Sequence, residues 1–512
     1  ALNAIARGEH RVIVLGLELG DGPLIESMVM RGELPFLGAL FRDGTHATLS
    51  TPAELLHVTA LPSLYTGTMP GEHGVYFTFQ PAPGLQGYRR FSKGQYGRPT
   101  FWKLLDEAGV RCAVLDAPYS HAEEGFGGAY VNDWGNWARY LSSAAVPASL
   151  LGQLRKACGN YPLGLEAHEL GMGKLEATDT ASRLLGSIKA KSAAIRWLGE
   201  HSRPNLLFSV FGETHVAGHY CYSADEYDAP TLDVYRALDA AIAEVAAWAG
   251  PSATLIVVSG DKPAPNNAGW HLLPEILARL GLLVAIDDQP SGNANRETTR
   301  SKRDPVKALR DLLPKDTRKK IAGWLPGALR DRLAQRVDMG GFDWSRTQVY
   351  CLPTDLEGCL RVNLRGREPQ GIVQPGEEYE RLVEQLTNDL LELVDPLTGR
   401  GVVKEVLDTR KTFPGSHQQH LPDLVVLWNE AAPIRAVSSQ KTGELRLPSP
   451  DPRPGSHSGP GFMLARGPGF PAGARLQGAS VLDLAPTLLA EFGVGAPEYM
   501  TGKPWPAMAG TC

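Results

Sequence analysis

Short apolar runs alternate along this chain with segments that carry apolar residues at helical spacing, and this alternation constrains the fold most. The run at 11–17, RVIVLGL, is apolar at almost every position, as in parallel strands that are covered on both faces of a sheet. The next segment, 22–44, has apolar residues at helical spacing and ends in glycine. We therefore expect a doubly wound α/β sheet.

The same pattern recurs further along the chain. The expected elements are helices over 101–109, 193–201, 232–250 and 481–493 and strands over 110–118, 205–213, 253–260 and 422–429. Strands that alternate with helices predict a mostly parallel sheet with right-handed crossovers.

Two stretches interrupt this rhythm. Residues 138–172 mix helix and loop signals, and residues 287–340 are rich in Arg, Lys, Asp and Pro. A solvated helical insertion and a binding tail both fit such a charge run, and we favour the insertion. Insertions after sheet strands often cover a site at the strand ends. The expected organisation is a core formed by 1–286 and 346–512, with a charged helical insertion or cap at 287–345.

Composition narrows the choice of partners. The chain has 512 residues, a net charge of -5 and a pI near 6.3, which gives no basic surface for nucleic acid and no polybasic membrane patch. No apolar run reaches the roughly 18 residues of a membrane helix, and the N-terminus lacks the pattern of a signal peptide. Six scattered cysteines without CxxC spacing are typical of reduced thiols. We expect a cytoplasmic protein that acts on a small molecule, and the sequence leaves the oligomeric state open.

Eight segments resemble, in order and spacing, the type I phosphodiesterase/nucleotide pyrophosphatase branch of the alkaline phosphatase superfamily. They read VIVLGLE, LYTGTMPGEHGVY, FGETHVAGHY, LIVVSGD, NAGWHLLPEIL, VNLRGREPQGIV, GSHSGPGFMLARGPGF and VLDLAPTLLAEFGV. The resemblance implies an α/β/α sandwich with a central, mostly parallel sheet and two divalent metals at its C-terminal edge. It also implies a Thr or Ser nucleophile, while the metals clamp the attacking and leaving oxygens of an in-line displacement.

The positions that bind the metals in that family are altered in this chain. By the resemblance, Glu18 replaces the aspartate that ends the first strand, and Asp261 stands where the family has an Asp-His pair. The family's D-x-x-x-H pair becomes His215-x-x-x-His219, and His457 matches the last histidine. These replacements still offer metal ligands.

The position of the nucleophile is also altered. The family's nucleophile lies about nine residues before the Thr-Gly of its TGxxPxxHG segment, and counting back from Thr66 reaches His57. The nearest hydroxyl belongs to Thr59, two residues away, and a shift in register would make it the nucleophile. We treat Glu18, His57, Thr59 and Asp261 as candidate catalytic residues.

The candidate ligands divide into one site with His215, His219 and His457 and a second site with Glu18, His57 and Asp261. Three imidazoles with an open position are a known arrangement for catalytic zinc and for redox metals. More nitrogen and less negative charge than in the family favour a transition metal over magnesium or calcium. We expect one or two zinc, iron or manganese ions, and the identity stays open.

Three hypotheses for the function remain. The first is a metal-dependent enzyme with an altered, histidine-rich site that is not an ordinary phosphodiesterase, in which the metal serves as Lewis acid, activator of water or redox centre. The second is a phosphodiesterase, phosphatase or sulfatase that retains the family's hydrolytic activity, with Thr59 or a metal-activated water as nucleophile. The third is a catalytically inactive binding protein.

Overall fold

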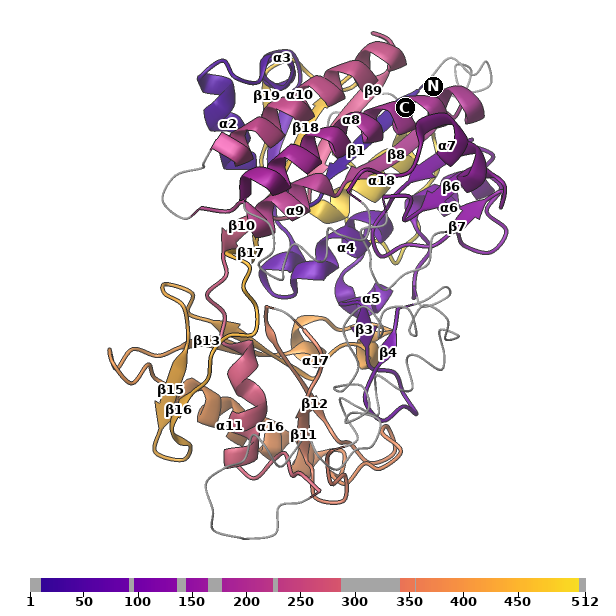
Figure 1. The fold of residues 1–512 in the computed structure, drawn as a ribbon. Helices are drawn as coiled ribbons and strands as arrows, with labels where there is room; N and C mark the ends of the chain where they lie inside the picture. Colours follow the sequence, from indigo (N-terminus) through magenta and orange to yellow (C-terminus); the bar gives the residue numbers. More distant parts are fainter. Residues whose placement is uncertain are drawn as a thin grey trace.

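The computed structural model describes residues 11–91, 96–135, 144–163, 177–223, 229–286, 341–354 and 356–505. A nine-stranded sheet forms the centre of the larger lobe, with strand order β19-β2-β18-β9-β1-β8-β5-β6-β7 (Figure 1). Its strands are β1 (Val12–Leu17), β2 (Thr45–Leu49), β5 (Cys112–Leu115), β6 (Ala129–Asn132), β7 (Ala144–Val146), β8 (Leu206–Phe211), β9 (Thr254–Ser259), β18 (Gly461–Arg466) and β19 (Ala474–Leu476). The strands β9-β1-β8-β5-β6 run parallel, which confirms the expected α/β class and mostly parallel sheet.

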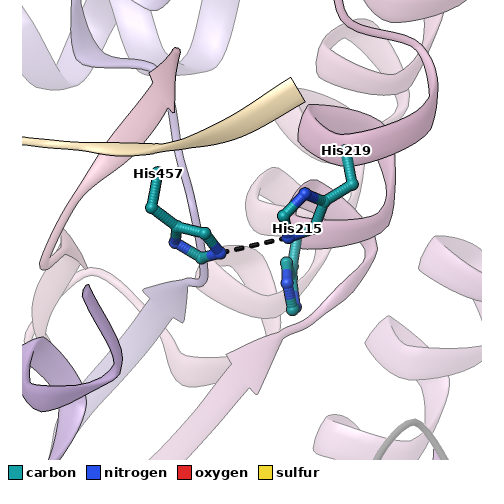
Figure 2. Close-up of side chains that lie close together, drawn as sticks. All are labelled: His215, His219 and His457. Carbon is teal, nitrogen blue, oxygen red and sulfur yellow. Dashed lines mark hydrogen bonds between the residues drawn. The ribbon is translucent and has the colours of Figure 1, made fainter. Parts of the chain in front are cut away.

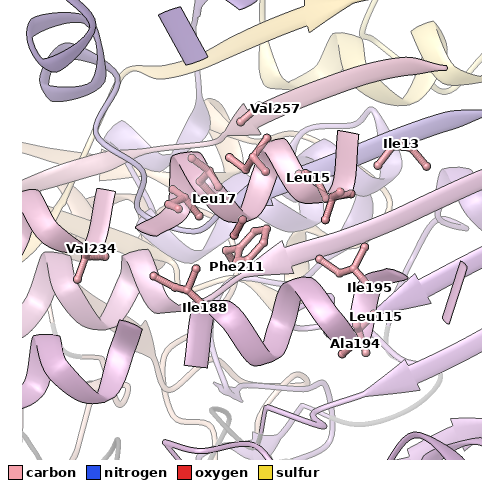
Figure 3. Close-up of a cluster of buried hydrophobic side chains, with 14 of the residues drawn as sticks. Ile13, Leu15, Leu17, Leu115, Ile188, Ala194, Ile195, Phe211, Val234 and Val257 are labelled. Atoms are coloured by element: carbon pink, nitrogen blue, oxygen red, sulfur yellow. The ribbon is translucent and has the colours of Figure 1, made fainter. Parts of the chain in front are cut away.

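Helices cover both faces of this sheet because alternate side chains of each strand point to opposite faces. Ile13, Leu15 and Leu17 of β1 belong to one buried cluster, which also holds residues of α2, α3, α8 and α10 (Figure 3). Val12 and Val14 belong to the other, with residues of α4, α6 and α18. The helices are α2 (Gly22–Met30), α3 (Pro35–Asp43), α4 (Ala60–Thr66), α5 (Pro70–His73), α6 (Phe101–Glu107), α7 (Leu150–Cys158), α8 (Ala177–Ser202), α9 (Glu213–Tyr220), α10 (Ala229–Ala249) and α18 (Leu484–Glu491). The result is the expected α/β/α sandwich.

A second, smaller lobe lies below the first in Figure 1 and is built on a four-stranded antiparallel sheet, β11-β12-β14-β13. Its elements are α11 (Leu273–Arg279), β11 (Val349–Cys351), β12 (Gly358–Val362), α16 (Glu377–Leu391), β13 (Val403–Asp408), α17 (Thr409–Thr412), β14 (Leu424–Trp428), β15 (Ala436–Ser439) and β16 (Gly443–Arg446). The strand expected at 422–429 therefore forms as β14, but it lies in this antiparallel sheet and not in the central one.

Besides the antiparallel pair of β15 and β16 in the smaller lobe, the described residues form two further two-stranded ribbons. The chain leaves the larger lobe through β10 (Lys262–Pro265) and returns through β17 (Gly455–Ser458), and these two strands pair with each other (Figure 1). The other ribbon joins β3 (Phe79–Gln80) and β4 (Arg89–Arg90).

The expected helical insertion at 287–345 lies almost entirely outside the described residues, since the structure describes residues up to 286 and again from 341. The division into 1–286, 287–345 and 346–512 therefore stays a prediction. Among the helices that the structure describes, none combines the length and the apolarity needed to cross a bilayer.

Candidate metal centre

The carboxyl ends of β1, β8 and β9 meet at one edge of the central sheet, and the candidate residues follow these ends. Glu18 comes directly after β1, and β8 leads into α9, which carries His215 and His219. Asp261 lies two residues beyond the end of β9. Because β1 pairs in parallel with both β8 and β9, residues that are distant in sequence converge at this edge, where α/β proteins commonly bind ligands.

Local hydrogen bonds fix the direction in which the chain leaves the sheet. The hydroxyl of Thr214, in the first turn of α9, donates to the Glu18 carbonyl at 2.6 Å. The Ser259 hydroxyl at the end of β9 accepts from the Gly20 N–H at 2.9 Å. Leu19, between Glu18 and Gly20, adopts a left-handed φ of 57°. This conformation is unfavourable for an L-residue and persists only where the surrounding structure holds it. The edge is therefore held by bonds between neighbouring strand ends.

A third segment, β17, reaches the same edge and carries His457. A Cβ atom added at Gly455 would lie 1.8 Å from the Gly218 carbonyl oxygen of α9. Only a glycine at 455 permits this close approach of strand and helix. The approach places His457 opposite His219.

The three histidines form one cluster at this edge. His215, His219 and His457 each offer a ligand nitrogen, and these nitrogens all lie within 4.8 Å of one another (Figure 2). The ring centroids are 4.5 Å apart for His215 and His219, 4.9 Å for His219 and His457, and 5.1 Å for His215 and His457. The structure thus brings together the side chains that the sequence assigned to one metal.

Neighbouring acceptors hold two of these rings in a defined orientation. His219 places Nδ1 2.7 Å from the Gly455 carbonyl oxygen, and His457 places Nδ1 2.7 Å from Oδ2 of Asp261. A carbonyl oxygen can only accept, so the Nδ1 of His219 carries a proton, and an ionised Asp261 requires the same of His457. In the neutral rings Nε2 then carries the lone pair.

The contact between these rings fits a bound cation. Nε2 of His219 and Nε2 of His457 lie 3.1 Å apart (dashed line in Figure 2), and two lone pairs at that distance repel unless a cation or a proton lies between them. Two nitrogens bound to a tetrahedral zinc at roughly 2.0–2.1 Å stand about 3.3 Å apart. The residues present therefore fit a transition-metal ion.

Glu18 lies beside this cluster in a buried environment. Its Oε1 is 3.5 Å from Nδ1 of His215, and among the described residues its buried Oε2 has no hydrogen-bond partner. Burial, and then the charge of Asp261, raises the pKa of Glu18 well above its ordinary value. A buried carboxylate oxygen of this kind is stabilised by a cation or by a proton.

Asp261 uses both of its oxygens at the edge of the sheet. Oδ1 accepts from the Leu19 N–H at 3.0 Å, and Oδ2 is the oxygen that contacts His457. This is the geometry of a carboxylate that orients a metal-binding histidine. The expectation that Asp261 binds a second metal together with Glu18 and His57 stays a prediction.

His57 lies next to the cluster and is held by a residue that the sequence did not reveal. Its ring centroid is 4.8 Å from that of His457. Nδ1 of His57 is 2.7 Å from Oε2 of Glu357, and its backbone N–H donates to Oε1 of the same carboxylate at 2.7 Å. Glu357 belongs to the smaller lobe, directly before β12, and no local pattern marks it.

Thr59, the other candidate nucleophile, is fully buried. Its hydroxyl donates to the Leu56 carbonyl at 2.5 Å. This arrangement favours a structural role at the start of α4 over an attack on substrate.

A buried charged cluster lies further along the same edge, at the ends of β5 and β8. Lys191 of α8 forms an ion pair with Asp116, and Asp116 also accepts from the N–H of Trp134 at 2.6 Å. Tyr161 donates to Glu213 at 2.6 Å. Burial raises the pKa of Glu213, although Lys191 and Tyr161 oppose the shift. These residues were not predicted from the sequence, although Asp116 and Glu213 follow buried strands as Glu18 does.

Comparisons with known proteins agree with this architecture. The sequence model of the family described as type I phosphodiesterase / nucleotide pyrophosphatase matches residues 21–441. The structure is similar to human ectonucleotide pyrophosphatase / phosphodiesterase 5, with a TM-score of 0.53 and 12% identity over 96% of this chain and 97% of that chain. An inactive variant of the murine protein in complex with AMP gives a TM-score of 0.52, 12% identity and the same coverage. No curated protein matches the chain in sequence. The family match confirms the resemblance, and the structural matches show the shared fold.

Proposed function

Because the chain belongs to the type I phosphodiesterase/nucleotide pyrophosphatase family, we propose that it is a metal-dependent hydrolase of phosphodiester or pyrophosphate bonds whose site uses imidazoles in place of carboxylate ligands. The observation that supports this proposal is the convergence of His215, His219 and His457 at the edge of the central sheet, with ligand nitrogens within 4.8 Å. The substrate is a small phosphoryl compound.

A transition-metal ion at the three histidines would polarise a phosphoryl oxygen and acidify a water molecule. The residues of the chain orient the ligands and determine which group can attack. Asp261 and the Gly455 carbonyl orient His457 and His219 so that each turns Nε2 to the cluster. Since the Thr59 hydroxyl is buried and donates to Leu56, the attacking nucleophile is water and not a threonine side chain.

The donor set favours particular metals. Neutral imidazole nitrogens suit zinc and iron better than magnesium or calcium, which prefer oxygen ligands. Three histidines also leave the open coordination position of catalytic zinc. We therefore propose zinc first, with iron or manganese as the alternatives.

A second candidate function follows from Glu18. Histidines with one nearby carboxylate are the donors of non-haem iron oxygenases, and Oε1 of Glu18 lies 3.5 Å from Nδ1 of His215. This alternative predicts iron in the purified protein and consumption of oxygen with an organic substrate. Zinc content and hydrolysis without oxygen support the hydrolase.

The proposed function is tested by metal analysis together with hydrolysis of bis(p-nitrophenyl) phosphate and p-nitrophenyl thymidine monophosphate. We expect chelation to abolish hydrolysis and zinc to restore it. His219→Ala should lose the bound metal and lower kcat/KM by more than about 100-fold, since changes that only disturb the surroundings of a ligand already cost roughly 10–100-fold.

The matched control is His201→Ala, which removes an exposed histidine that stacks on Trp197 of α8. This variant should keep the metal and the activity of the unmodified protein. If His219→Ala retains both as well, the assignment of the metal to the histidine cluster is wrong.

A further inference from the structure

The contact between His57 and Glu357 joins the two lobes at the candidate metal centre. Both carboxylate oxygens take part, since Oε1 accepts the backbone N–H of His57 and Oε2 lies against Nδ1, each at 2.7 Å. Both side chains are largely buried, with exposed fractions of 6% for His57 and 12% for Glu357. A buried contact that uses both oxygens defines the position of the imidazole more closely than a single surface hydrogen bond does.

The contact also selects a tautomer of the ring. An ionised carboxylate can only accept hydrogen bonds, so the proton of His57 lies on Nδ1 and the lone pair on Nε2. The two nitrogens lie on opposite sides of the ring, so Nε2 points away from Glu357. The carboxylate thus fixes which nitrogen of His57 can accept a hydrogen bond from another molecule.

Two further rings limit the rotation of His57. Phe77 packs edge-on against it at a centroid distance of 6.1 Å, and His457 lies 4.8 Å away. The ring is therefore held between an aromatic side chain and one of the proposed metal ligands. Close packing of this kind is what keeps a functional side chain in a single orientation.

We propose that Glu357 is a positioning residue, supplied by the smaller lobe, that holds His57 in the tautomer in which Nε2 accepts a hydrogen bond from the attacking water. The inference rests on the proposed hydrolase function and extends it, because it assigns a role to a residue outside the metal centre. The attacking water reaches the phosphorus correctly oriented only when both lobes are in place.

The tautomer can be observed directly in the zinc-loaded protein by NMR with isotope-labelled histidine. We expect a slowly exchanging Nδ1–H proton of His57 far downfield. It is distinguished from the Nδ1–H signals of His219 and His457, which also contact acceptors at 2.7 Å, by its loss in His57→Gln. Glu357→Gln should remove or strongly shift this signal, because an amide cannot accept both donors as a carboxylate does. Glu384→Gln, which changes an exposed carboxylate of α16 in the same lobe, should leave the signal unchanged.

Kinetics supply the second readout. Glu357→Gln should lower kcat by roughly 10–100-fold while KM changes less than about threefold and the zinc content is unchanged, as for residues that orient a functional group. Glu357→Asp should restore part of the loss. The double variant His57→Gln with Glu357→Gln should be little worse than His57→Gln alone, since both changes remove one function.

The outcomes separate this inference from the proposed function. A wild-type kcat in Glu357→Gln, or effects of the two substitutions that simply multiply, would overturn the role of Glu357 and leave a metal-dependent hydrolase. Absence of the His57 signal from the unmodified protein would overturn it as well. If hydrolysis by the unmodified protein does not depend on metal, the proposed hydrolase function is wrong. The NMR measurement of the His57 tautomer would still test the contact with Glu357 in that case.

Discussion

The hydroxyl of Thr59 separates two accounts of the chemistry at the scale of a single residue. Besides this hydroxyl, the backbone N–H of Thr59 also donates to the Leu56 carbonyl, at 3.1 Å. In Thr59→Ala the backbone N–H still donates to the Leu56 carbonyl, so this oxygen is not left without a hydrogen bond. The substitution should therefore lower the unfolding free energy by only about 1 kcal/mol. Activity should stay within a few-fold of the unmodified protein. Chemical denaturation and kcat/KM measure the two quantities, and a fall in kcat of several orders of magnitude would make Thr59 the nucleophile.

Glu430, close to Glu357, gives a prediction about pH. Burial, and then the charge of Glu357, raises the pKa of Glu430 from 4.5 to about 7. Between these values the folded protein holds a proton that the unfolded chain releases, so the free energy of unfolding falls as the pH rises. Glu430→Gln has no carboxyl group at this position, so its unfolding free energy does not fall with pH for this reason. It should be more stable than the unmodified protein above about pH 7, by up to about 3 kcal/mol, and equally stable below about pH 4.

The measurement is denaturant unfolding of both proteins across this pH range. A difference in stability that is constant with pH, or that grows toward acid, would contradict the raised pKa of Glu430.

At the scale of elements, Asp261 connects three segments of the site. It follows β9, accepts from the N–H of Leu19 after β1, and orients His457 on β17. An asparagine has only one acceptor oxygen in its side chain, so Asp261→Asn can accept from Leu19 or from His457 but not from both with separate oxygens. It should weaken zinc binding by roughly 10–100-fold. Competition with a chelator measures the affinity, and Asp43→Asn, an exposed carboxylate at the end of α3, is the control. Equal affinities in the two variants would show that Asp261 does not orient His457.

The elements of the core could be predicted because burial leaves a signal in the sequence. The apolar runs at 11–17, 205–213 and 253–260 became β1, β8 and β9 with ends that differ by one or two residues. The helix expected at 193–201 is only the last part of α8, which begins at Ala177. The smaller lobe was not recognised as separate, because its strands are short and the run at 422–429 looks like any buried strand. The strands with which a segment pairs decide which sheet it joins, and a single sequence does not show these partners.

At the scale of the whole molecule, the site is made of residues that only the fold brings together. The three histidines of the candidate metal centre could be predicted because they lie next to strand ends and family motifs. Glu357 could not be predicted, because it lies 300 residues from its partner His57 in a loop of the other lobe. A contact between two lobes leaves no local pattern in the sequence, so the candidate ligands could be predicted and Glu357, which contacts the neighbouring His57, could not.

The most direct test of the central claim is a crystal structure of the zinc-loaded protein with anomalous data collected on both sides of the zinc absorption edge. We predict one strong anomalous peak within about 2.0–2.1 Å of a nitrogen of each of His215, His219 and His457. A structure with zinc present in excess that shows these rings turned apart, or in contact with no anomalous peak among them, would contradict the account.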